Sequence, residues 1–198
     1  MSNHYFVKRP KSKPDLGVLR TYFRGRLFEF VTASGVFSKT RIDPGTRLLI
    51  EFMTLPERGS VLDVGCGYGP VGIAAATFNP NLKVVMTDVN ERAVWLAKEN
   101  AKRNALQNVK VKQGLLYEPV GDMKFEAILS NPPITAGMKV VEPLITEAPK
   151  HLVKDGLLQV VVRSKIGGKR LTNLMNRAFG NVDILARKGG YRVLLSKS

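Results

Sequence analysis

From residue 59 onward, apolar positions along the chain follow two alternating patterns. Five short runs are almost continuously apolar, which is typical of parallel strands covered on both faces of a sheet. The segments between them have the spacing and boundary residues of helices. The alternation predicts an open, doubly wound α/β sheet that is mostly parallel. The expected strands are SVLDVG (60–65), KVVMTD (83–88), VKVKQG (109–114), FEAILS (125–130) and LLQVVVRS (157–164).

Four segments are expected to be helices. The first has a proline near its start, and the second has an asparagine as its N-cap. The third is interrupted by two prolines, and the fourth has one apolar face and a glycine directly after it. In chain order they are PVGIAAATF (70–78), NERAVWLAKENAKRNAL (90–106), KVVEPLITEAPKHLVKDG (139–156) and KRLTNLMNRAF (169–179).

Both ends of the chain contain hairpin patterns. The tail NVDILARKGGYRVLLSKS (181–198) has two strand-like runs joined around two glycines, which predicts a C-terminal antiparallel hairpin. LRTYFRGRLFEFVTAS (19–34) has two aromatic-rich runs around an Arg-Gly pair, which predicts another hairpin. We therefore expect a small, basic N-terminal extension with a β-hairpin over residues 1–40. Residues 41–198 are expected to form the catalytic-type domain, which starts with a helix signalled by Asp43 before a proline.

The composition excludes several kinds of site. Among 198 residues, Cys66 is the only cysteine, and His4 and His151 are the only histidines. An internal disulfide or a cysteine-rich zinc site is therefore excluded, and a metal cluster or a histidine-based triad has almost no raw material. The chain has no apolar run of about 18 residues and no apolar segment behind its basic N-terminus. We expect a cytoplasmic protein without metal or membrane contact.

The formal charge of +15 is concentrated at the ends of the chain. Residues 1–58 hold 11 Lys/Arg and 5 Asp/Glu, residues 59–150 hold 10 and 9, and residues 151–198 hold 10 and 2. Basic flanks around a nearly neutral centre suit a polyanionic partner such as a nucleic acid. The alternative is a generally basic surface that serves solubility.

The stretch VLDVGCGYG (61–69) ends a predicted strand in three alternating glycines. Such a turn lets a ligand approach backbone N–H groups at a helix N-terminus. A dinucleotide-binding fingerprint would need a glycine at Pro70, so an oxidoreductase is disfavoured. Asp63 precedes the turn, and Asp88 closes the next strand, where a carboxylate can accept hydrogen bonds from ribose hydroxyls. The alternative is a tight strand–helix turn with two surface acids.

The stretch FEAILSNPPITAG (125–137) ends another strand at Asn131. Ligands of open α/β sheets bind outside the carboxyl ends of the strands, so Asn131 is expected beside Asp63 and Asp88. The Asn131 side-chain oxygen and the Pro132 carbonyl can accept hydrogen bonds from a planar amine and localise its lone pair. The two prolines hold both acceptors in place beforehand. The alternative is a rigid exit from the strand.

The glycine turn and its two acids resemble motif I and the acidic partner of class I S-adenosylmethionine-dependent methyltransferases, which have a Rossmann-like fold. The resemblance implies S-adenosyl-L-methionine as the cofactor, with Asp63 orienting the turn and the methionine amino group and Asp88 holding the ribose. It departs at Leu115, where many relatives carry an aspartate that meets adenine. Cys66 is interpreted as a small residue in a tight turn rather than a nucleophile. The implied cofactor residues are Asp63, Gly65, Cys66, Gly67, Gly69, Asp88, Val89, Leu115, Leu116 and Asn131.

Asn-Pro-Pro followed by a hydrophobic residue is similar to the signature of amine-directed methyltransferases. These act on adenine N6, guanine N2 or glutamine N5, and many have an aromatic residue after the second proline. Here Ile134 takes that place, so stacking on a planar substrate has to come from elsewhere. The catalytic residues that the resemblance implies are Asn131, Pro132, Pro133 and Ile134.

SGVFS (34–38) followed by IDPGTRLLIEF (42–52) resembles the entry segment of the small-domain (MTS) methyltransferase group. The group includes guanine-N2 methyltransferases of small-subunit ribosomal RNA and archaeal single-domain relatives. Without the second domain of the bacterial enzymes, RNA docking would fall to the basic flanks. Phe37 is either a cover for the cofactor or base, or a packed aromatic. The candidate RNA contacts are Lys8, Arg9, Lys11, Lys13, Lys165, Lys169 and Arg170.

Three functions remain open at this stage. The first is S-adenosylmethionine-dependent methyl transfer to an exocyclic amine of an RNA base, with guanine N2 in ribosomal RNA favoured. The second keeps the chemistry and changes the substrate to a protein glutamine. The third is a non-catalytic RNA-binding or assembly factor. We expect a monomer, with a dimer as the alternative.

Overall fold

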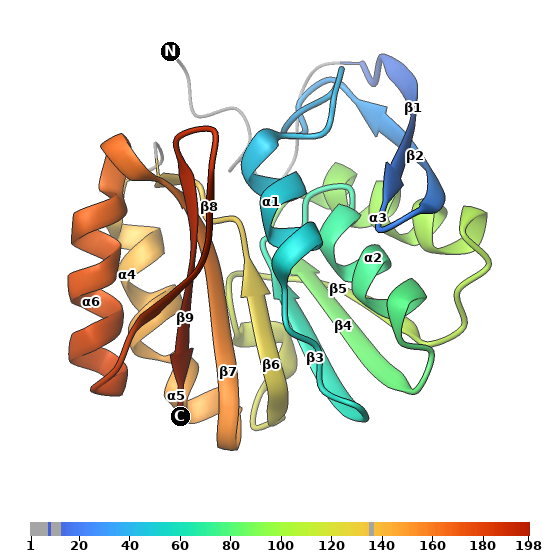
Figure 1. Ribbon diagram of the computed structural model, residues 1–198. Helices are drawn as coiled ribbons and strands as arrows, with labels where there is room; N and C mark the ends of the chain where they lie inside the picture. The colour runs from blue at the N-terminus through green and yellow to red at the C-terminus, as the bar shows by residue number, and fades with distance from the viewer. Residues whose placement is uncertain (1–7, 9–12, 135–136) are drawn as a thin grey trace.

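The computed structural model describes residue 8 and residues 13–134 and 137–198. Its centre is a seven-stranded sheet in the order β5-β4-β3-β6-β7-β9-β8 (Figure 1). The five strands from β5 to β7 are parallel, and β9 and β8 add an antiparallel hairpin. The predicted fold class is confirmed. The strands are β3 (Gly59–Val64), β4 (Leu82–Asp88), β5 (Val109–Gln113), β6 (Phe125–Ser130), β7 (Leu152–Arg163), β8 (Asp183–Lys188) and β9 (Tyr191–Lys197).

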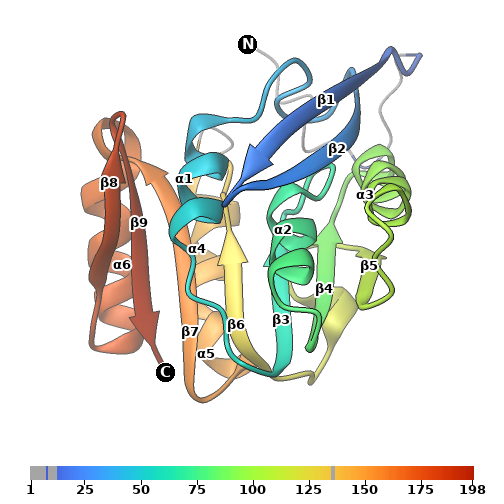
Figure 2. The same ribbon diagram turned by 45° about the vertical axis from the view of Figure 1, so that its right-hand side comes forward.

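Helices cover both faces of this sheet (Figure 2). Consecutive strand residues point to opposite faces, so Val61 joins the buried cluster under α1, α2 and α3, whereas Leu62 joins the cluster under α4 and α6. No helix within the described ranges is long and apolar enough to span a membrane. The helices are α1 (Pro44–Phe52), α2 (Pro70–Phe78), α3 (Glu91–Arg103), α4 (Met138–Thr146), α5 (Ala148–His151) and α6 (Lys169–Phe179).

Local sequence signals explain the start of α1, the start of α3 and the end of α6. Asp43 caps α1, since its side chain accepts a hydrogen bond from the Thr46 N–H. Asn90 caps α3 in the same way, and Gly180 ends α6 in the left-handed conformation that glycine adopts readily.

The expected helix over residues 139–156 was wrong at its end. The chain forms α4 with Pro143 inside it and the short α5, and β7 begins at Leu152 rather than at residue 157. Leu152 pairs with Phe125 on β6 across a register shift, and Asp155 and Gly156 bond to the backbone of Ser198. This pairing with distant segments extends the strand through Lys-Asp-Gly, a turn-like stretch.

The predicted N-terminal hairpin is confirmed as β1 (Leu16–Phe23) and β2 (Arg26–Ala33), a separate two-stranded sheet. The two turn residues, Arg24 and Gly25, both have positive φ, as a two-residue hairpin turn requires. Phe23, Phe28 and Phe30 from this hairpin lie in the same buried cluster as the apolar side chains of α2 and α3. The division of the chain at residue 40 stays a prediction, but this packing makes the hairpin part of the main core.

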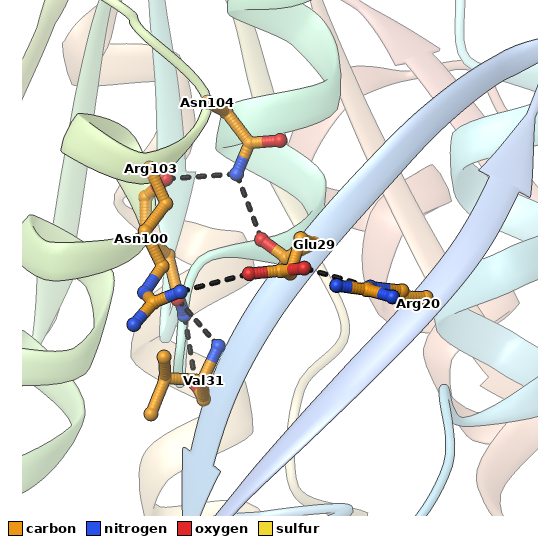
Figure 3. Close-up of polar contacts among 6 residues, drawn as sticks. All are labelled: Arg20, Glu29, Val31, Asn100, Arg103 and Asn104. Carbon is orange, nitrogen blue, oxygen red and sulfur yellow. Dashed lines mark hydrogen bonds and ion pairs between the residues drawn. The ribbon is translucent and has the colours of Figure 1, made fainter.

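Buried Asn100 on α3 ties the hairpin to the rest of the fold (Figure 3). Its Oδ1 accepts from the Val31 N–H at 2.7 Å, and its Nδ2 donates to the Val31 carbonyl at 2.9 Å. The same Nδ2 donates to the Tyr68 carbonyl at 2.8 Å. Since Tyr68 belongs to the glycine turn, one buried amide connects β2, α3 and the predicted cofactor loop.

Polar contacts at Glu29 extend this attachment at the surface (Figure 3). The Glu29 carboxylate pairs with Arg20 on β1 and with Arg103 on α3, each at 2.8 Å. Asn104 Nδ2 donates to the Glu29 carbonyl at 2.9 Å. The exposed ion pairs contribute little stability alone, so the buried Asn100 contacts hold the hairpin more strongly.

Candidate active site

The carboxyl ends of β3, β4, β6 and β7 meet at one edge of the sheet, around the point where the strand order reverses between β3 and β6. A cavity of about 530 Å³ lies there, which is the size range of small-molecule sites. It brings together thirteen of the residues predicted from sequence: Phe37, Asp63, Gly65, Cys66, Gly67, Asp88, Val89, Leu115, Leu116, Asn131, Pro132, Pro133 and Ile134.

The glycine turn forms one wall of this cavity. The backbone N–H groups of Gly65 and Cys66 donate to the Thr87 carbonyl at 2.9 Å, which ties the turn to β4. Gly65 and Gly67 have φ of 73° and 57°, and a Cβ there would meet no described atom within 4 Å. Glycine is favoured at both positions by the left-handed backbone, and their open side lies on the cavity.

Gly69 is placed differently from the other two glycines. It does not line the cavity but forms the N-cap of α2 with φ of 94°. A Cβ at this position would lie 3.0 Å from Ile73 Cδ1. Its position makes it a shaper of the strand–helix turn, and direct contact with a cofactor stays a prediction.

Asp63 lies on β3 beneath the turn and is 2% exposed. Its Oδ2 accepts from the Gly72 N–H at 2.8 Å, which fixes the first turn of α2 to the strand. Burial, opposed by the hydrogen bond from the Gly72 N–H and assisted by the nearby charge of Asp88, raises the pKa of Asp63 to about 7. A cationic ligand group beside this carboxylate would favour its ionised form.

Asp88 connects two backbone turns at the end of β4. Its Oδ2 accepts from the Gly67 N–H and its Oδ1 from the Asn90 N–H, both at 2.8 Å. Burial raises the pKa of Asp88, while these backbone hydrogen bonds lower it. Each carboxylate oxygen retains acceptor capacity for a ligand hydroxyl.

Cys66 is a buried residue within the turn. Burial, followed by the charges of Asp88 and Asp63, raises the pKa of its thiol well above the ordinary value. The protonated thiol is a poor nucleophile, which favours the interpretation of Cys66 as a small residue that fills a tight turn.

Val89 after β4 and the loop after β5 form an apolar wall of the cavity. Val89, Leu115 and Leu116 line the cavity together. Leu116 has φ of 48°, and its carbonyl accepts from Thr87 Oγ1 at 3.2 Å. This wall presents apolar surface at Leu115, the position where many family members carry an aspartate. Its contact with adenine stays a prediction.

Asn131 follows β6 and faces the N-terminus of α1. Its Nδ2 donates to Asp43 Oδ2 at 3.0 Å and to Thr46 Oγ1 at 2.9 Å. The Pro132 carbonyl accepts from the Ile134 N–H at 2.9 Å, so one of its two lone pairs serves the turn. Asp43 and Thr46 line the cavity, although the sequence indicated only a helix start at Asp43.

The cavity rim contains residues that sequence reasoning missed. Arg163 is the only Lys or Arg among the described residues that line the cavity. Its guanidinium lies 5.7 Å from the centre of the Tyr191 ring. The sequence signal for Arg163 was its place at the end of β7, the strand next to the one that carries Asn131.

Three predicted RNA contacts lie outside this cavity. Lys165, Lys169 and Arg170 line a second hollow of about 500 Å³, which shares Ile134 with the first. Lys8 and Lys13 are exposed elsewhere on the surface, whereas Arg9 and Lys11 lie outside the described residues. Across the described ranges, no group of three or more His, Cys, Asp or Glu side chains is arranged to hold a metal ion.

Residues 27–195 match the family described as "Methyltransferase small domain". The chain is 40% identical over 199 residues to YbxB of Bacillus subtilis, an uncharacterized protein, with 100% of this chain and 99% of that protein covered. It is 33% identical over 166 residues to ribosomal RNA small subunit methyltransferase C of Photorhabdus laumondii, with 82% and 48% covered. The corresponding enzyme of Haemophilus influenzae is 32% identical over 185 residues, with 90% and 54% covered.

Solved structures show the same fold. The T. thermophilus 16S rRNA N2 G1207 methyltransferase (RsmC), solved in complex with AdoMet and guanosine, superposes with a TM-score of 0.83 at 23% identity. The match covers 95% of this chain and 52% of that one. The chain thus spans about half the length of the ribosomal RNA methyltransferases that it matches.

Proposed function

Because the chain belongs to the methyltransferase small-domain family, we propose that it transfers a methyl group from S-adenosyl-L-methionine to an exocyclic amine of ribosomal RNA, with guanine N2 as the expected target. The identity to small-subunit ribosomal RNA methyltransferases supports the substrate class. The observation that carries the proposal is the convergence of Asp63, Asp88 and Asn131 on one cavity. Cytoplasmic location and a monomeric state stay predictions.

The cavity fits the cofactor on its β3–β4 side. The open glycine turn offers backbone room, and the carboxylates of buried Asp63 and half-buried Asp88 line the same cavity. Asp63 suits the methionine ammonium, because a cation beside this carboxylate favours its charged form, which burial alone disfavours. Asp88 suits the two ribose hydroxyls, and the apolar wall of Val89, Leu115 and Leu116 suits the adenine ring. When bound, the cofactor supplies a methyl group on a positively charged sulfur.

The acceptor side fits a weakly nucleophilic amine. Asn131 Oδ1 and the second lone pair of the Pro132 carbonyl can accept the two N–H bonds of an exocyclic amine. These hydrogen bonds favour a pyramidal nitrogen whose lone pair is available to the methyl carbon, and the amine proton is lost after transfer. Holding the reacting atoms in line supplies much of the acceleration. Asn131 acts here as an acceptor and not as a general base.

The basic hollow beside the cavity supports RNA as the substrate. Lys165, Lys169 and Arg170 are exposed cations next to Ile134, so they can contact phosphates that flank a flipped base. A protein glutamine has no comparable need for cations, and the absence of an aromatic residue at Ile134 also disfavours that substrate.

Methyl-label transfer tests the proposal. The protein is incubated with S-adenosyl-[methyl-³H]methionine and either unmodified small-subunit ribosomal RNA or total cell protein. We expect the label in RNase-sensitive material and in N2-methylguanosine after nucleoside digestion. RNA affinity should fall about 10³-fold or more between 50 and 200 mM salt if six or more phosphates are contacted. Label in protease-sensitive material, or salt-independent RNA binding, would contradict RNA as the substrate.

A further inference from the structure

The carboxamide of Asn131 is held at its nitrogen end by the first turn of α1. The two contacts from Nδ2, at 3.0 Å to Asp43 Oδ2 and 2.9 Å to Thr46 Oγ1, match the two N–H bonds that this nitrogen carries. Thr46 is 5% exposed, so water competes little for its hydroxyl. Both donors of the amide are therefore committed within the protein.

The chemistry of Asp43 determines which end of the amide faces which way. A carboxylate oxygen only accepts hydrogen bonds, so the amide atom next to Asp43 Oδ2 has to be nitrogen. Oδ1 is then the amide atom that points away from Asp43, and no donor from the described part of the chain forms a hydrogen bond with it. Because Asn131 lines the cavity, this oxygen is the acceptor available to a ligand there.

We propose that Asp43 and Thr46 are positioning residues for methyl transfer, which fix the Asn131 carboxamide with Oδ1 as the acceptor for the substrate amine. This role rests on the proposed function. A rotated amide would place Oδ1 against the carboxylate of Asp43 and lose the hydrogen bond to it. Donation to a carboxylate also polarises the amide and makes its oxygen a stronger acceptor.

The α1 turn that performs this task is itself held in place. Asp43 Oδ2 also accepts from the Thr46 N–H at 2.9 Å, which joins the two positioning residues. At Gly45, a Cβ would lie 2.9 Å from the Tyr191 ring on β9, so the helix start packs closely against the sheet. Pro132 restrains the Asn131 backbone from the other side. The acceptor is therefore fixed before substrate arrives.

The pair Thr46→Val and Thr46→Ser tests this role. Valine keeps the branched shape and the backbone N–H to Asp43 but removes the hydroxyl, whereas serine keeps the hydroxyl. With labelled cofactor and unmodified small-subunit ribosomal RNA, Thr46→Val should lower kcat about tenfold, the equivalent of one net hydrogen bond. Its KM for both substrates and its Tm should stay near wild type, and Thr46→Ser should retain the activity.

Two further measurements separate positioning from a structural role. In the Asn131→Ala background, Thr46→Val should cost no further activity, because the effect passes through Asn131. In the ¹⁵N-labelled protein without cofactor, the Asn131 side-chain NH₂ should exchange with water faster in Thr46→Val than in wild type or Thr46→Ser. Should Thr46→Val fail to fold, Asp43→Gly against Asp43→Asn repeats the comparison, since glycine is an acceptable N-cap.

The outcomes distinguish this inference from the proposed function. A wild-type kcat in Thr46→Val, or an equal loss in the Asn131→Ala background, overturns the positioning role and leaves methyl transfer intact. A wild-type protein that methylates no RNA overturns the proposed function together with the catalytic part of this role. The amide-exchange comparison then still decides whether Asp43 and Thr46 orient Asn131.

Discussion

On the β3–β4 side of the cavity, the polar groups are carboxylates bonded to backbone N–H groups, whereas on the β6–β7 side they are an amide and, further out, cations. Asp63 and Asp88 accept hydrogen bonds from backbone N–H groups that are between 2 and 21 positions away in the chain. Asn131 is instead held by side chains 85 and 88 positions away. The β3–β4 side is therefore built from neighbouring strands and turns, whereas the position of Asn131 depends on contacts between distant parts of the chain.

The two sides also differ in charge, which matches two different ligands. On the β3–β4 side, Asp63 and Asp88 bring two acids to the cavity, and no Lys or Arg among the described lining residues lies there. On the opposite side the one acid, Asp43, is bonded to Asn131, and beyond it the charged groups are basic: Arg163, and then Lys165, Lys169 and Arg170 in the adjoining hollow. Acids suit a cationic donor and cations suit a polyanionic acceptor, so each proposed substrate has its own half of the site.

Asn131→Ala should produce the largest effect and confine it to the acceptor half. Removal of a preorganised hydrogen-bonding group from a reacting centre costs about 10²–10³-fold in kcat. The Kd for S-adenosylmethionine should stay near wild type in calorimetry, because Asp63 and Asp88 are untouched. Asn131→Asp is the matched variant, since it keeps an acceptor oxygen but loses both N–H donors and faces the Asp43 carboxylate. Full activity in Asn131→Asp would contradict the assignment of this amide.

Asp88→Ala should affect the cofactor half alone and by a smaller factor. A hydrogen bond to a charged group contributes about 1.5–3 kcal/mol, so the Kd for the cofactor should rise about 10- to 100-fold. At saturating cofactor, single-turnover methyl transfer should approach the wild-type rate. The cofactor Kd of Asp88→Asn, which keeps one acceptor oxygen for the Gly67 N–H, should lie between those of the wild type and Asp88→Ala. An equal loss of cofactor affinity in Asn131→Ala would show that the halves are not separate.

The cofactor half was predictable because its parts are adjacent in sequence. The turn from Gly65 to Gly69, the strand that carries Asp63 and the strand that ends at Asp88 all carry local signals. Their meeting follows from the parallel sheet alone. The same locality made the starts of the helices at Pro70 and after Asn90 predictable to within a residue.

The acceptor half was only partly predictable because it depends on tertiary packing. Asn131 was recognisable from the two prolines, but the pairing with Asp43 joins segments with no sequence signal in common. The N-terminus of α1 packs closely against Tyr191 on β9, and in this position Asp43 and Thr46 contact Asn131. The same reason explains the early start of β7, where pairing with β6 and the C-terminus overrides a turn-like stretch.

The pH dependence of cofactor binding should be the smallest effect and should belong to the β3–β4 half alone. Burial raises the pKa of Asp63 to about 7, so below that pH this carboxyl holds a proton in the free protein. Binding of the cofactor's ammonium favours the ionised form and releases that proton. Affinity should therefore be flat above pH 7 and weaken below it, by at most about tenfold per pH unit.

The free energy of unfolding should also depend on pH through the titration of Asp63. The folded state keeps the Asp63 proton up to about pH 7, whereas the unfolded chain loses it near 3.8, the ordinary pKa of an aspartate. The free energy of unfolding should therefore decrease as pH rises between these values, by at most about 1.4 kcal/mol per unit from this group. Calorimetry at pH 6 and 8 in buffers of different ionisation enthalpy measures the proton released on cofactor binding. Asp63→Asn, which can still accept from the Gly72 N–H, should remove this proton release. If the wild-type protein binds the cofactor without releasing a proton, the proposed contact between Asp63 and the ammonium is contradicted.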